Sequence, residues 1–272
     1  MPEIALATRH GKERQIAPAL AAIGWQVVVS DIDTDAFGTF SGDVARVLTP
    51  KQTALAKARA GAEHLGVRYG MASEGSIGSH PSLPFVTSDF EILAFADTQL
   101  DLTWAETFLG SEIVAVSEKW SQELDLDAFA KRADLPNHAV IVRNGDNHIV
   151  WVKKGLRDVE EIVAAAEECA AHHETVVLES DFRAMCSPSR QRNIEACAEK
   201  FALRLARLCE SCGYPGWGIT GLEFGLPCSD CGELVADVAN AELHGCLACS
   251  RAEKVPLGKT AVGPERCHSC NP

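Results

Sequence analysis

Eight cysteines arranged as four CxxC pairs constrain this chain more than any other feature of its sequence. All eight lie in the last 64 residues, whereas no cysteine precedes Cys169. A CxxC pair forms a tight turn that presents two thiolates, and two such turns can enclose a Zn²⁺ ion in a tetrahedron. The sequence therefore predicts two structural zinc ions. The expected ligands are Cys209, Cys212, Cys228, Cys231, Cys246, Cys249, Cys267 and Cys270.

The spacing of the pairs bears on which of them share a metal ion. Fifteen residues separate the first pair from the second, and 17 separate the third from the fourth. Both lengths suit a four-cysteine zinc ribbon and favour sequential pairing. Cross-braced pairing, in which the first pair joins the third and the second joins the fourth, is the alternative. Four thiolates leave no open coordination position, so we expect structural and not catalytic zinc, and an iron–sulfur cluster is the less favoured metal.

The charge of the chain limits its partners. The formal net charge is −13, and two four-cysteine zinc sites would bring it to about −17. A body this acidic repels the phosphates of nucleic acids, so no nucleic-acid partner is expected. The zinc segment itself holds four Lys and Arg against eight Asp and Glu. A protein contact, for example through the apolar segment 214–227, or a purely structural role is therefore expected for it.

The hydropathy pattern predicts a cytoplasmic protein without membrane contact. No apolar run reaches the ~18 residues that a membrane span requires. The N-terminus lacks the basic and long apolar regions of an export signal. Without export, clustered cysteines indicate metal binding and not disulfides.

The first part of the chain alternates strands and helices. The predicted strands cover residues 4–8, 25–31 and 67–73, and the predicted helices cover residues 11–24 and 50–65. This β-α-β-α-β order indicates a mostly parallel or mixed sheet. Two further strands, expected to be antiparallel, are predicted over residues 85–97 and 112–120. Gly145-Asp146 predicts a hairpin within 138–155.

The expected fold class is α/β, a mixed sheet with helices on both faces, followed by a small double zinc-ribbon module. Helices are predicted over 158–173 and from Pro188 to Leu205, with a strand at 175–181 between them. The last helix leads almost directly into Cys209 without a Gly-rich or Pro-rich linker. We place the α/β domain at residues 1–207 and the zinc module at 208–272.

Polar residues gather where the first and third predicted strands end. Thr8, His10 and Lys12 lie where the first strand leads into a helix, a position that favours an anion such as phosphate. A capped helix start with an exposed lysine is the alternative. Glu74 follows the third strand beside a glycine, where a carboxylate could hold Mg²⁺ or orient water. Lys57 lies on the helix between them, where a solvated face is the alternative.

The order of these motifs resembles the inosine/xanthosine triphosphate pyrophosphatases. The shared elements are a strand ending in Thr-x-His-Gly-Lys, a helix carrying Ala-Leu-Ala-Lys-Ala and a strand ending in Ser-Glu-Gly, within residues 4–78. The resemblance implies that Thr8, His10 and Lys12 hold phosphate, that Lys57 assists and that Glu74 binds Mg²⁺. A complete Mg²⁺ site would need one more carboxylate. The candidates are Asp43, Asp89 and Glu91.

A second polar cluster lies between the strand at 175–181 and the last helix of the domain. Asp181, Arg183 and Arg190 could form a pocket rim on which arginines clamp phosphate. The alternative is a structural ion pair together with a helix cap at Ser187. The sequence supports both interpretations.

The chain as a whole resembles a bacterial family known only as a domain of unknown function. The shared features are the His-Gly-Lys-Glu start, the Ser-Glu-Gly-Ser segment and the cysteine-rich tail. Two hypotheses follow for the function. The first is a metal-dependent hydrolase of a phosphorylated, nucleotide-like small molecule, with Lys12 and Glu74 as catalytic residues and Thr8, His10, Lys57 and Arg183 as substrate-binding residues. The second is a non-catalytic ligand-binding or adaptor protein that contacts a partner protein through the zinc module.

Overall fold

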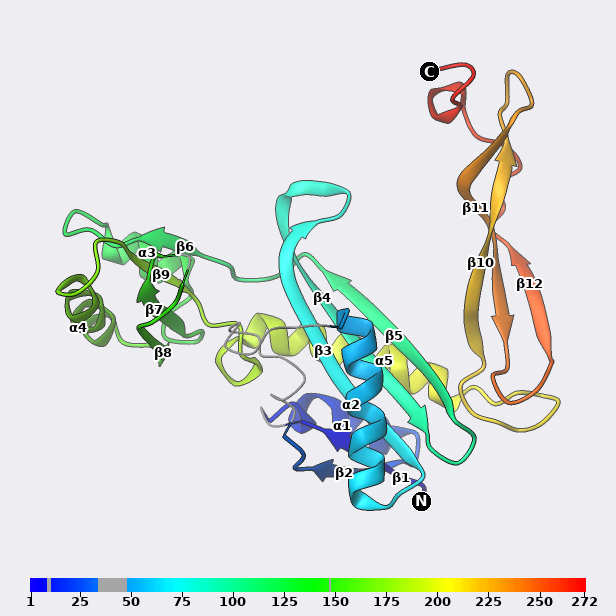
Figure 1. Cartoon of the computed structure of the whole chain (residues 1–272), viewed down its shortest axis with the longest axis horizontal. Helices are drawn as coiled ribbons and strands as arrows, with labels where there is room; N and C mark the ends of the chain where they lie inside the picture. The colour runs from blue at the N-terminus through cyan, green and yellow to red at the C-terminus, as the bar shows by residue number, and fades with distance from the viewer. Residues whose placement is uncertain (9–10, 34–47, 147) are drawn as a thin grey trace. The chain divides into compact units, whose positions relative to one another are not determined.

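The computed structural model describes residues 1–8, 11–33, 48–146 and 148–272 (Figure 1). The chain divides into two compact units, residues 1–201 and 202–272. The expected mixed α/β fold is confirmed: the described residues form five α-helices and three sheets. Among these helices, none combines the length and apolar character needed to cross a membrane.

The first unit is built on a mixed five-stranded sheet with the order β2-β1-β3-β4-β5. Strands β2, β1 and β3 run parallel, whereas β4 and β5 continue the sheet as antiparallel neighbours. The strands are β1 (Glu3–Ala7), β2 (Gln26–Ser30), β3 (Tyr69–His80), β4 (Leu83–Asp97) and β5 (Leu102–Gly110). Helix α1 (Glu13–Ala22) connects β1 to β2, and α2 (Pro50–Leu65) connects β2 to β3. The predicted β-α-β-α-β opening is therefore confirmed.

Helix α2 packs closely on one face of this sheet because small residues line the interface. Ala54 and Ala58 of the helix lie in one buried cluster with Ala72 of β3 and Ala94 of β4. A Cβ atom at Gly70 of β3 would lie 1.9 Å from the carbonyl oxygen of Ala58, so only glycine allows this approach. The capping box of Thr49 and Gln52 fixes the start of the helix.

The opposite face of the sheet is covered by helix α5 (Pro188–Ala206). Successive residues of a strand point to opposite faces, so Phe95 faces away from its α2-facing neighbours Ala94 and Ala96. The ring of Phe95 lies 5.1 Å from that of Trp104 and 6.5 Å from that of Phe201 on α5. An aromatic core thus joins α5 to the sheet, and the prediction of helices on both faces is confirmed.

A smaller antiparallel sheet with the order β6-β9-β7-β8 completes the first unit. Its strands are β6 (Ser117–Lys119), β7 (Val140–Asn144), β8 (Val152–Leu156) and β9 (Val176–Ser180). Helices α3 (Leu126–Arg132) and α4 (Val159–Ala170) contribute Phe129 and Ile162 to its core, against Val142 and Leu178. The predicted pairing around Gly145-Asp146 is confirmed, since β7 and β8 are antiparallel neighbours.

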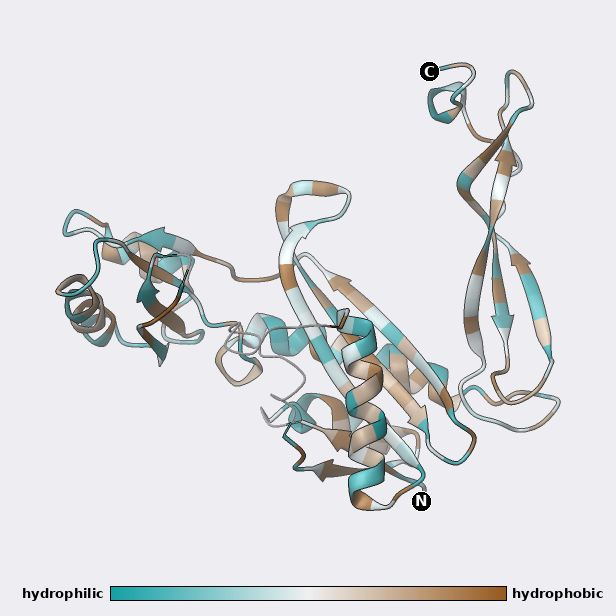
Figure 2. Ribbon diagram, viewed as in Figure 1, coloured by the Kyte–Doolittle hydropathy of each residue, from teal (hydrophilic) through white to brown (hydrophobic). Residues whose placement is uncertain are grey.

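The second unit contains a three-stranded antiparallel sheet with the order β10-β11-β12. Its strands are β10 (Gly218–Pro227), β11 (Leu234–Gly245) and β12 (Ala252–Pro256). Apolar and polar residues both occur along these strands (Figure 2). The buried cluster of this unit is small and includes Leu226, Val235 and Val262 with two of the cysteines. A sheet with so little buried apolar surface needs an additional source of stability.

Candidate functional site

The first candidate site lies beyond the carboxyl end of β1, where the connections of the parallel strands diverge. The chain leaves β1 through α1 to reach β2 on one side, and returns through α2 to β3 on the other side. Open α/β sheets bind ligands in the crevice outside such a switch point. Ala7, the last residue of β1, is in register with Ala72, so Ser73 and Glu74 of β3 extend beyond the end of β1.

Lys12 enters this switch point from the start of α1. Its side chain is buried, and Nζ donates to the hydroxyl of Ser73 at 3.0 Å and to the Ser73 carbonyl oxygen at 3.4 Å. Burial, and next the guanidinium of Arg190, lower the pKa of Lys12 from 10.5 to about 8. Thr8 is also buried, whereas Arg9 and His10 lie outside the described residues. Lys12 therefore presents a buried ammonium group at the switch point, where it donates to Ser73.

Glu74 and Lys57 form a buried ion pair on the α2 side of β3. Lys57 Nζ lies 2.5 Å from Glu74 Oε1, and both side chains are about nine-tenths buried. Glu74 is in register with Ile92, which belongs to the cluster beneath α2. Lys57 and Glu74 thus meet on the α2 side of β3, and Lys12 binds Ser73 of the same strand. Glu74 was expected to follow this strand, but β3 continues to His80, so Glu74 lies within it. The structure also gives Glu74 a cationic partner within the protein.

Two further acids lie on β4, on the face that α5 covers. Arg190 Nε donates to Glu91 Oε1 at 2.6 Å, and Asn193 Nδ2 donates to Asp89 Oδ2 at 2.9 Å. Arg190 also donates to the carbonyl oxygen of Phe182 at 2.6 Å. All four side chains of these two pairs are buried. Glu91 is in register with Gly75, two residues beyond the Ser73 that binds Lys12, so this group adjoins the switch point.

The protonation of Asp89 is set by its surroundings. Burial, and next the carboxylate of Glu91, raise the pKa of Asp89 from 3.8 to about 7. The amide of Asn193 and the guanidinium of Arg190 act in the opposite direction. Asp89 therefore exchanges a proton near neutral pH, which is a property of acid–base groups in functional sites.

Sequence reasoning included Asp89, Glu91 and Arg190 only as additional candidates and missed Asn193. The available signal was the pattern Asp-x-Glu within a strand that is otherwise apolar, which puts two carboxylates on one buried face. Arg190 and Asn193 are three residues apart on a helix and share one face. Asp43, the third carboxylate considered, lies outside the described residues.

Arg183 is engaged in a local ion pair. Its guanidinium binds both carboxylate oxygens of Asp181, with Nη2 at 2.6 Å from Oδ2. A further contact of 3.6 Å joins Nη2 to the sulfur of Cys186. The hydroxyl of Ser187 accepts from the backbone N–H of Arg190 at 3.4 Å. These contacts match the alternative interpretation, a structural ion pair together with a helix cap at Ser187. A substrate-binding role of Arg183 stays a prediction.

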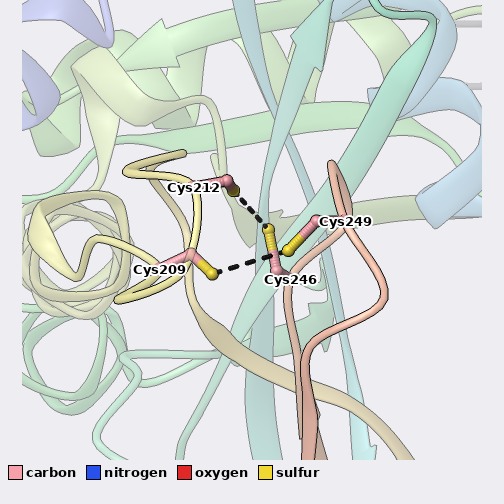
Figure 3. A group of neighbouring side chains, drawn as sticks. All are labelled: Cys209, Cys212, Cys246 and Cys249. Atoms are coloured by element: carbon pink, nitrogen blue, oxygen red, sulfur yellow. Dashed lines mark hydrogen bonds between the residues drawn. The ribbon is translucent and has the colours of Figure 1, made fainter.

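The second candidate site consists of two cysteine tetrads in the C-terminal unit. One tetrad comprises Cys209, Cys212, Cys246 and Cys249, and the other comprises Cys228, Cys231, Cys267 and Cys270. Figure 3 shows the four thiols of the first tetrad converging from two separate turns. The favoured sequential pairing is therefore wrong, and the cross-braced alternative is the one observed.

The strands between the pairs explain the cross-braced arrangement. The first and third pairs flank the ends of β10 and β11 that meet in the register Gly218–Gly245. The second pair lies at the other end of this hairpin, where Pro227 is in register with Leu234. The chain after β12 returns to that end, since Cys228 forms a bridge with Val262. Residues between successive pairs thus form extended strands that carry the pairs to opposite ends of the sheet, about 30 Å apart at ~3.3 Å per residue.

The sulfur geometry fits a tetrahedral metal ion. The closest Sγ–Sγ separations are 3.7 Å and 3.5 Å in the first tetrad, and 3.8 Å and 3.6 Å in the second. Zn–S bonds of about 2.3 Å place the sulfurs of a tetrahedral site about 3.8 Å apart. A disulfide would need about 2.05 Å. The tetrads can therefore hold metal ions, as the cysteine pattern predicted.

The turn of the second CxxC pair favours an ionised thiol at Cys228. The backbone N–H groups of Cys231 and Asp230 donate toward the sulfur of Cys228 and lower the pKa of this thiol to about 7. Gly232 follows with a φ of 76°, a left-handed conformation that lets the turn close. Only thiolates bind Zn²⁺, so these N–H groups prepare the ligand for the metal.

Comparison with known proteins identifies a family but no activity. The sequence model of one family, described as Domain of unknown function (DUF6671), matches residues 57–272. No curated protein matches the chain. Among solved structures, the chain is similar to a nucleoside-triphosphatase, a dITP/XTP pyrophosphatase, from Mycobacterium abscessus. The identity is 14%, the TM-score is 0.27, and the match covers 41% of this chain and 74% of that one.

Proposed function

Since the chain belongs to the DUF6671 family, whose description gives no activity, we propose a function from the geometry of its two sites. The switch-point cluster binds the phosphate group of a small phosphorylated molecule, and the two cysteine tetrads hold structural zinc ions. The observation that carries the first part is the buried ammonium group of Lys12 at the carboxyl end of β1.

The charges of the cluster favour an anion. Lys12, Lys57 and Arg190 contribute three positive charges, and Glu74 and Glu91 contribute two negative charges. A protonated Asp89 adds no charge, so these six described residues together carry one net positive charge within an acidic protein. An anion that contacts Lys12 would stabilise a charge that is otherwise buried with weak compensation.

The nucleotide-like character of the ligand rests on the resemblance of the Thr-x-His-Gly-Lys, Ala-Leu-Ala-Lys-Ala and Ser-Glu-Gly motifs to nucleoside triphosphate pyrophosphatases. The buried ammonium group of Lys12 supports an anionic ligand. A nucleotide would place its phosphates beside Lys12. Thr8, His10 and Lys57 stay proposed phosphate contacts.

Hydrolysis of the bound phosphate is the second candidate function, and Asp89 is the observation that favours it. A carboxyl group that exchanges its proton near neutral pH can accept a proton from water, and because Asp89 is fully buried this water would have to enter with the ligand. The water oxygen would form the new bond to phosphorus as the bond to the leaving oxygen breaks, and Lys12 would stabilise the charge on the phosphate oxygens. A non-catalytic binding protein lacks this turnover but keeps the same anion contacts.

A resident Mg²⁺ ion does not fit Glu74 as the side chains lie. Glu74 Oε1 accepts from Lys57, and Glu91 Oε1 accepts from Arg190. Within the part of the chain that the structure describes, no third acid joins either carboxylate in a possible metal site. We therefore derive no step through a protein-bound Mg²⁺ ion. Assays with and without added Mg²⁺ test whether a metal ion enters the site together with a nucleotide.

The experiment is a panel of nucleotides that includes inosine, xanthosine and standard triphosphates, each with and without Mg²⁺ or Mn²⁺. Binding and the release of phosphate and pyrophosphate are both measured. Lys12→Met should lose binding, whereas Asp89→Asn should keep binding and lose any turnover. Absence of binding to every phosphorylated ligand by folded, metal-loaded protein would contradict the proposed function. Binding without turnover would favour the non-catalytic alternative.

The identity of the metal is tested separately by elemental analysis of the purified protein. The four-thiolate donor sets and their sulfur spacing favour Zn²⁺. We expect two zinc ions per chain and an unfolded C-terminal unit after chelation. Contact with a partner protein through this unit stays a prediction.

A further inference from the structure

Asp89 and Glu91 form an unusual pair on β4. They are two residues apart on one strand and therefore point to the same face of the sheet. Each lies beside a glycine of a neighbouring strand, since Glu91 is in register with Gly75 and Asp89 with Gly110. A Cβ atom at Gly75 would lie 2.5 Å from Glu91 Oε1. One at Gly110 would lie 2.6 Å from the Asn193 side chain. The two glycines make room for polar side chains above the sheet.

The hydrogen-bond donors around this pair satisfy only one oxygen of each carboxylate. Arg190 donates to Oε1 of Glu91, and Asn193 donates to Oδ2 of Asp89. The other two oxygens, Glu91 Oε2 and Asp89 Oδ1, are buried and have no hydrogen-bond partner among the described residues. The two unpartnered oxygens belong to carboxylates that extend from the same face of β4 two residues apart. Two neighbouring buried acceptors without a donor are unfavourable unless a proton lies between them.

We propose that Asp89 and Glu91 share one proton, and that binding of an anion beside Lys12 strengthens the hold of the pair on this proton. The second half of this inference rests on the proposed function. The shared proton turns two competing acceptors into one hydrogen bond. It also removes a negative charge from beneath the anion site.

The neighbouring charges determine the direction of the coupling. Among the described residues, the charged and titratable groups around the pair are Arg190 and Cys197 on α5, Lys12 before α1, and the Lys57–Glu74 pair between α2 and β3. Burial, and next the carboxylate of Glu91, raise the pKa of the Cys197 thiol to about 12, so this thiol adds no charge near neutral pH. With the proton in place these groups sum to one positive charge, and without it to zero. An anion therefore binds the protonated form more tightly, and by linkage its binding raises the proton affinity of the pair. The pKa of Asp89, about 7, makes this exchange measurable at neutral pH.

Lys12 is the other group that could take up a proton. Its pKa is about 8, so it is mostly charged at pH 7 and contributes mainly at higher pH. Measurements between about pH 6 and about pH 7.5 therefore report chiefly on the carboxyl pair.

The first experiment detects the shared proton without any ligand. Carbon-13 NMR of the full-length, metal-loaded protein with labelled Asp carboxyl groups should show one carboxyl that titrates near pH 7. Asp89→Asn should remove this signal, whereas Asp101→Asn should leave it in place. Asp101 is a matched control because it is exposed and pairs with Arg59, and because Asn accepts its positive φ of 56°. A wild-type spectrum in which every Asp titrates below about pH 5 would overturn the inference.

The second experiment measures the coupling with sulfate, an anion that does not itself titrate near neutral pH. The dissociation constant of the wild type should rise about tenfold from pH 6 to pH 8. Asp89→Asn should bind sulfate with nearly constant affinity up to about pH 7.5, and Asp101→Asn should follow the wild type. Glu91→Gln offers a second variant, since its amide can donate to Asp89 and should shift the transition to lower pH.

The outcomes separate the two proposals. Sulfate binding that is independent of pH in the wild type would overturn the coupling and leave the proposed anion site intact. Failure of sulfate and of every phosphorylated ligand to bind would overturn the proposed function and, with it, the coupling. The carboxyl titration decides in that case whether the proton is shared.

Discussion

Nε2 of His138 accepts a hydrogen bond from the backbone N–H of Ser189 at 3.1 Å and lies 2.9 Å from the hydroxyl of the same residue. On the other side of the ring, Nδ1 lies 2.7 Å from a carboxylate oxygen of Asp134. Because the Ser189 N–H donates to Nε2, the proton of the neutral ring sits on Nδ1 and is donated to Asp134. The order Asp–His–Ser resembles that of a hydrolytic triad. Here Ser189 is only 1% exposed, so the hydroxyl is not accessible to a substrate.

These contacts fix the first turn of α5, which carries Arg190 next to Ser189. We predict that His138→Ala lowers the free energy of unfolding by about 3 kcal/mol, since it opens a cavity and removes the buried acceptor of the Ser189 N–H. Urea unfolding followed by tryptophan fluorescence measures this change. Asn137→Ala is the control, because Asn137 is exposed and also binds Asp134. Equal stability of the two variants would contradict a structural role of His138.

The cross-braced tetrads predict which double variants keep a metal ion. Cys209→Ser with Cys246→Ser should leave one of two metal ions, since both residues belong to the same tetrad. Cys209→Ser with Cys228→Ser should leave none, because each removes a ligand from a different tetrad. Elemental analysis of the purified variants gives the result directly. Sequential pairing would reverse the two outcomes.

The correct tetrads could not be read from the sequence because spacing alone does not show what lies between two pairs. A gap of 15 residues accommodates either a loop that returns to its starting point or a strand that leads away from it. In this chain β10 lies between the first and second CxxC pairs, and β11 lies between the second and third pairs. Strand pairing between distant residues, and not the length of the gap, decides which turns meet.

The segment 112–120 shows a related limit. Its apolar run predicts a long strand, yet only β6 (Ser117–Lys119) is regular, and β5 (Leu102–Gly110) was missed. The backbone N–H groups of Val114 and Val116 donate to the hydroxyls of Ser189 and Ser180. These side chains replace the neighbouring strand that the apolar run suggested. Apolar residues indicated burial correctly but could not indicate the hydrogen-bond partner.

The polar site was predictable only in part for the same reason. Local pattern correctly placed Lys12 after the first strand, but Glu74, expected to follow the third strand, lies within β3. The partners of Glu74 and Glu91 are Lys57 and Arg190, and the latter is 99 residues away in the sequence. Which carboxylates remain available to a ligand depends on these long-range ion pairs.

Lys12 should make the stability of the protein depend on pH in a specific direction. Its folded pKa of about 8 lies below the ordinary value of 10.5, so the unfolded chain binds more protons between these two values. The contribution of Lys12 to the free energy of unfolding therefore rises by up to about 3 kcal/mol as the pH rises from about 8 to 10.5. Lys12→Met lacks this contribution and should be more stable than the wild type at pH 7. Urea titrations should show that the difference in free energy of unfolding between the two proteins shrinks toward pH 10.5. If the two proteins depended on pH in the same way, Lys12 would not be buried as a charged group.

The close approach of Arg190 to β3 predicts different effects for two glycines of the same strand. A Cβ atom at Gly75 would lie 2.4 Å from Arg190 Nη2 and 2.5 Å from Glu91 Oε1, whereas one at Gly78 would meet nothing within 4 Å. Gly75→Ala must therefore displace the buried Arg190–Glu91 ion pair, and we expect it to lower the free energy of unfolding by about 2 kcal/mol.

Gly78→Ala is the matched control, since it adds the same methyl group to β3 and should be neutral or slightly stabilising. Gly75→Ala should also weaken sulfate binding, because a displaced Arg190 no longer neutralises Glu91 beside Lys12. Urea unfolding and sulfate titration of both variants test the two effects separately. If Gly75→Ala matched Gly78→Ala in both measurements, the Arg190–Glu91 pair would not lie over β3, and the charge balance assigned to the anion site would be wrong.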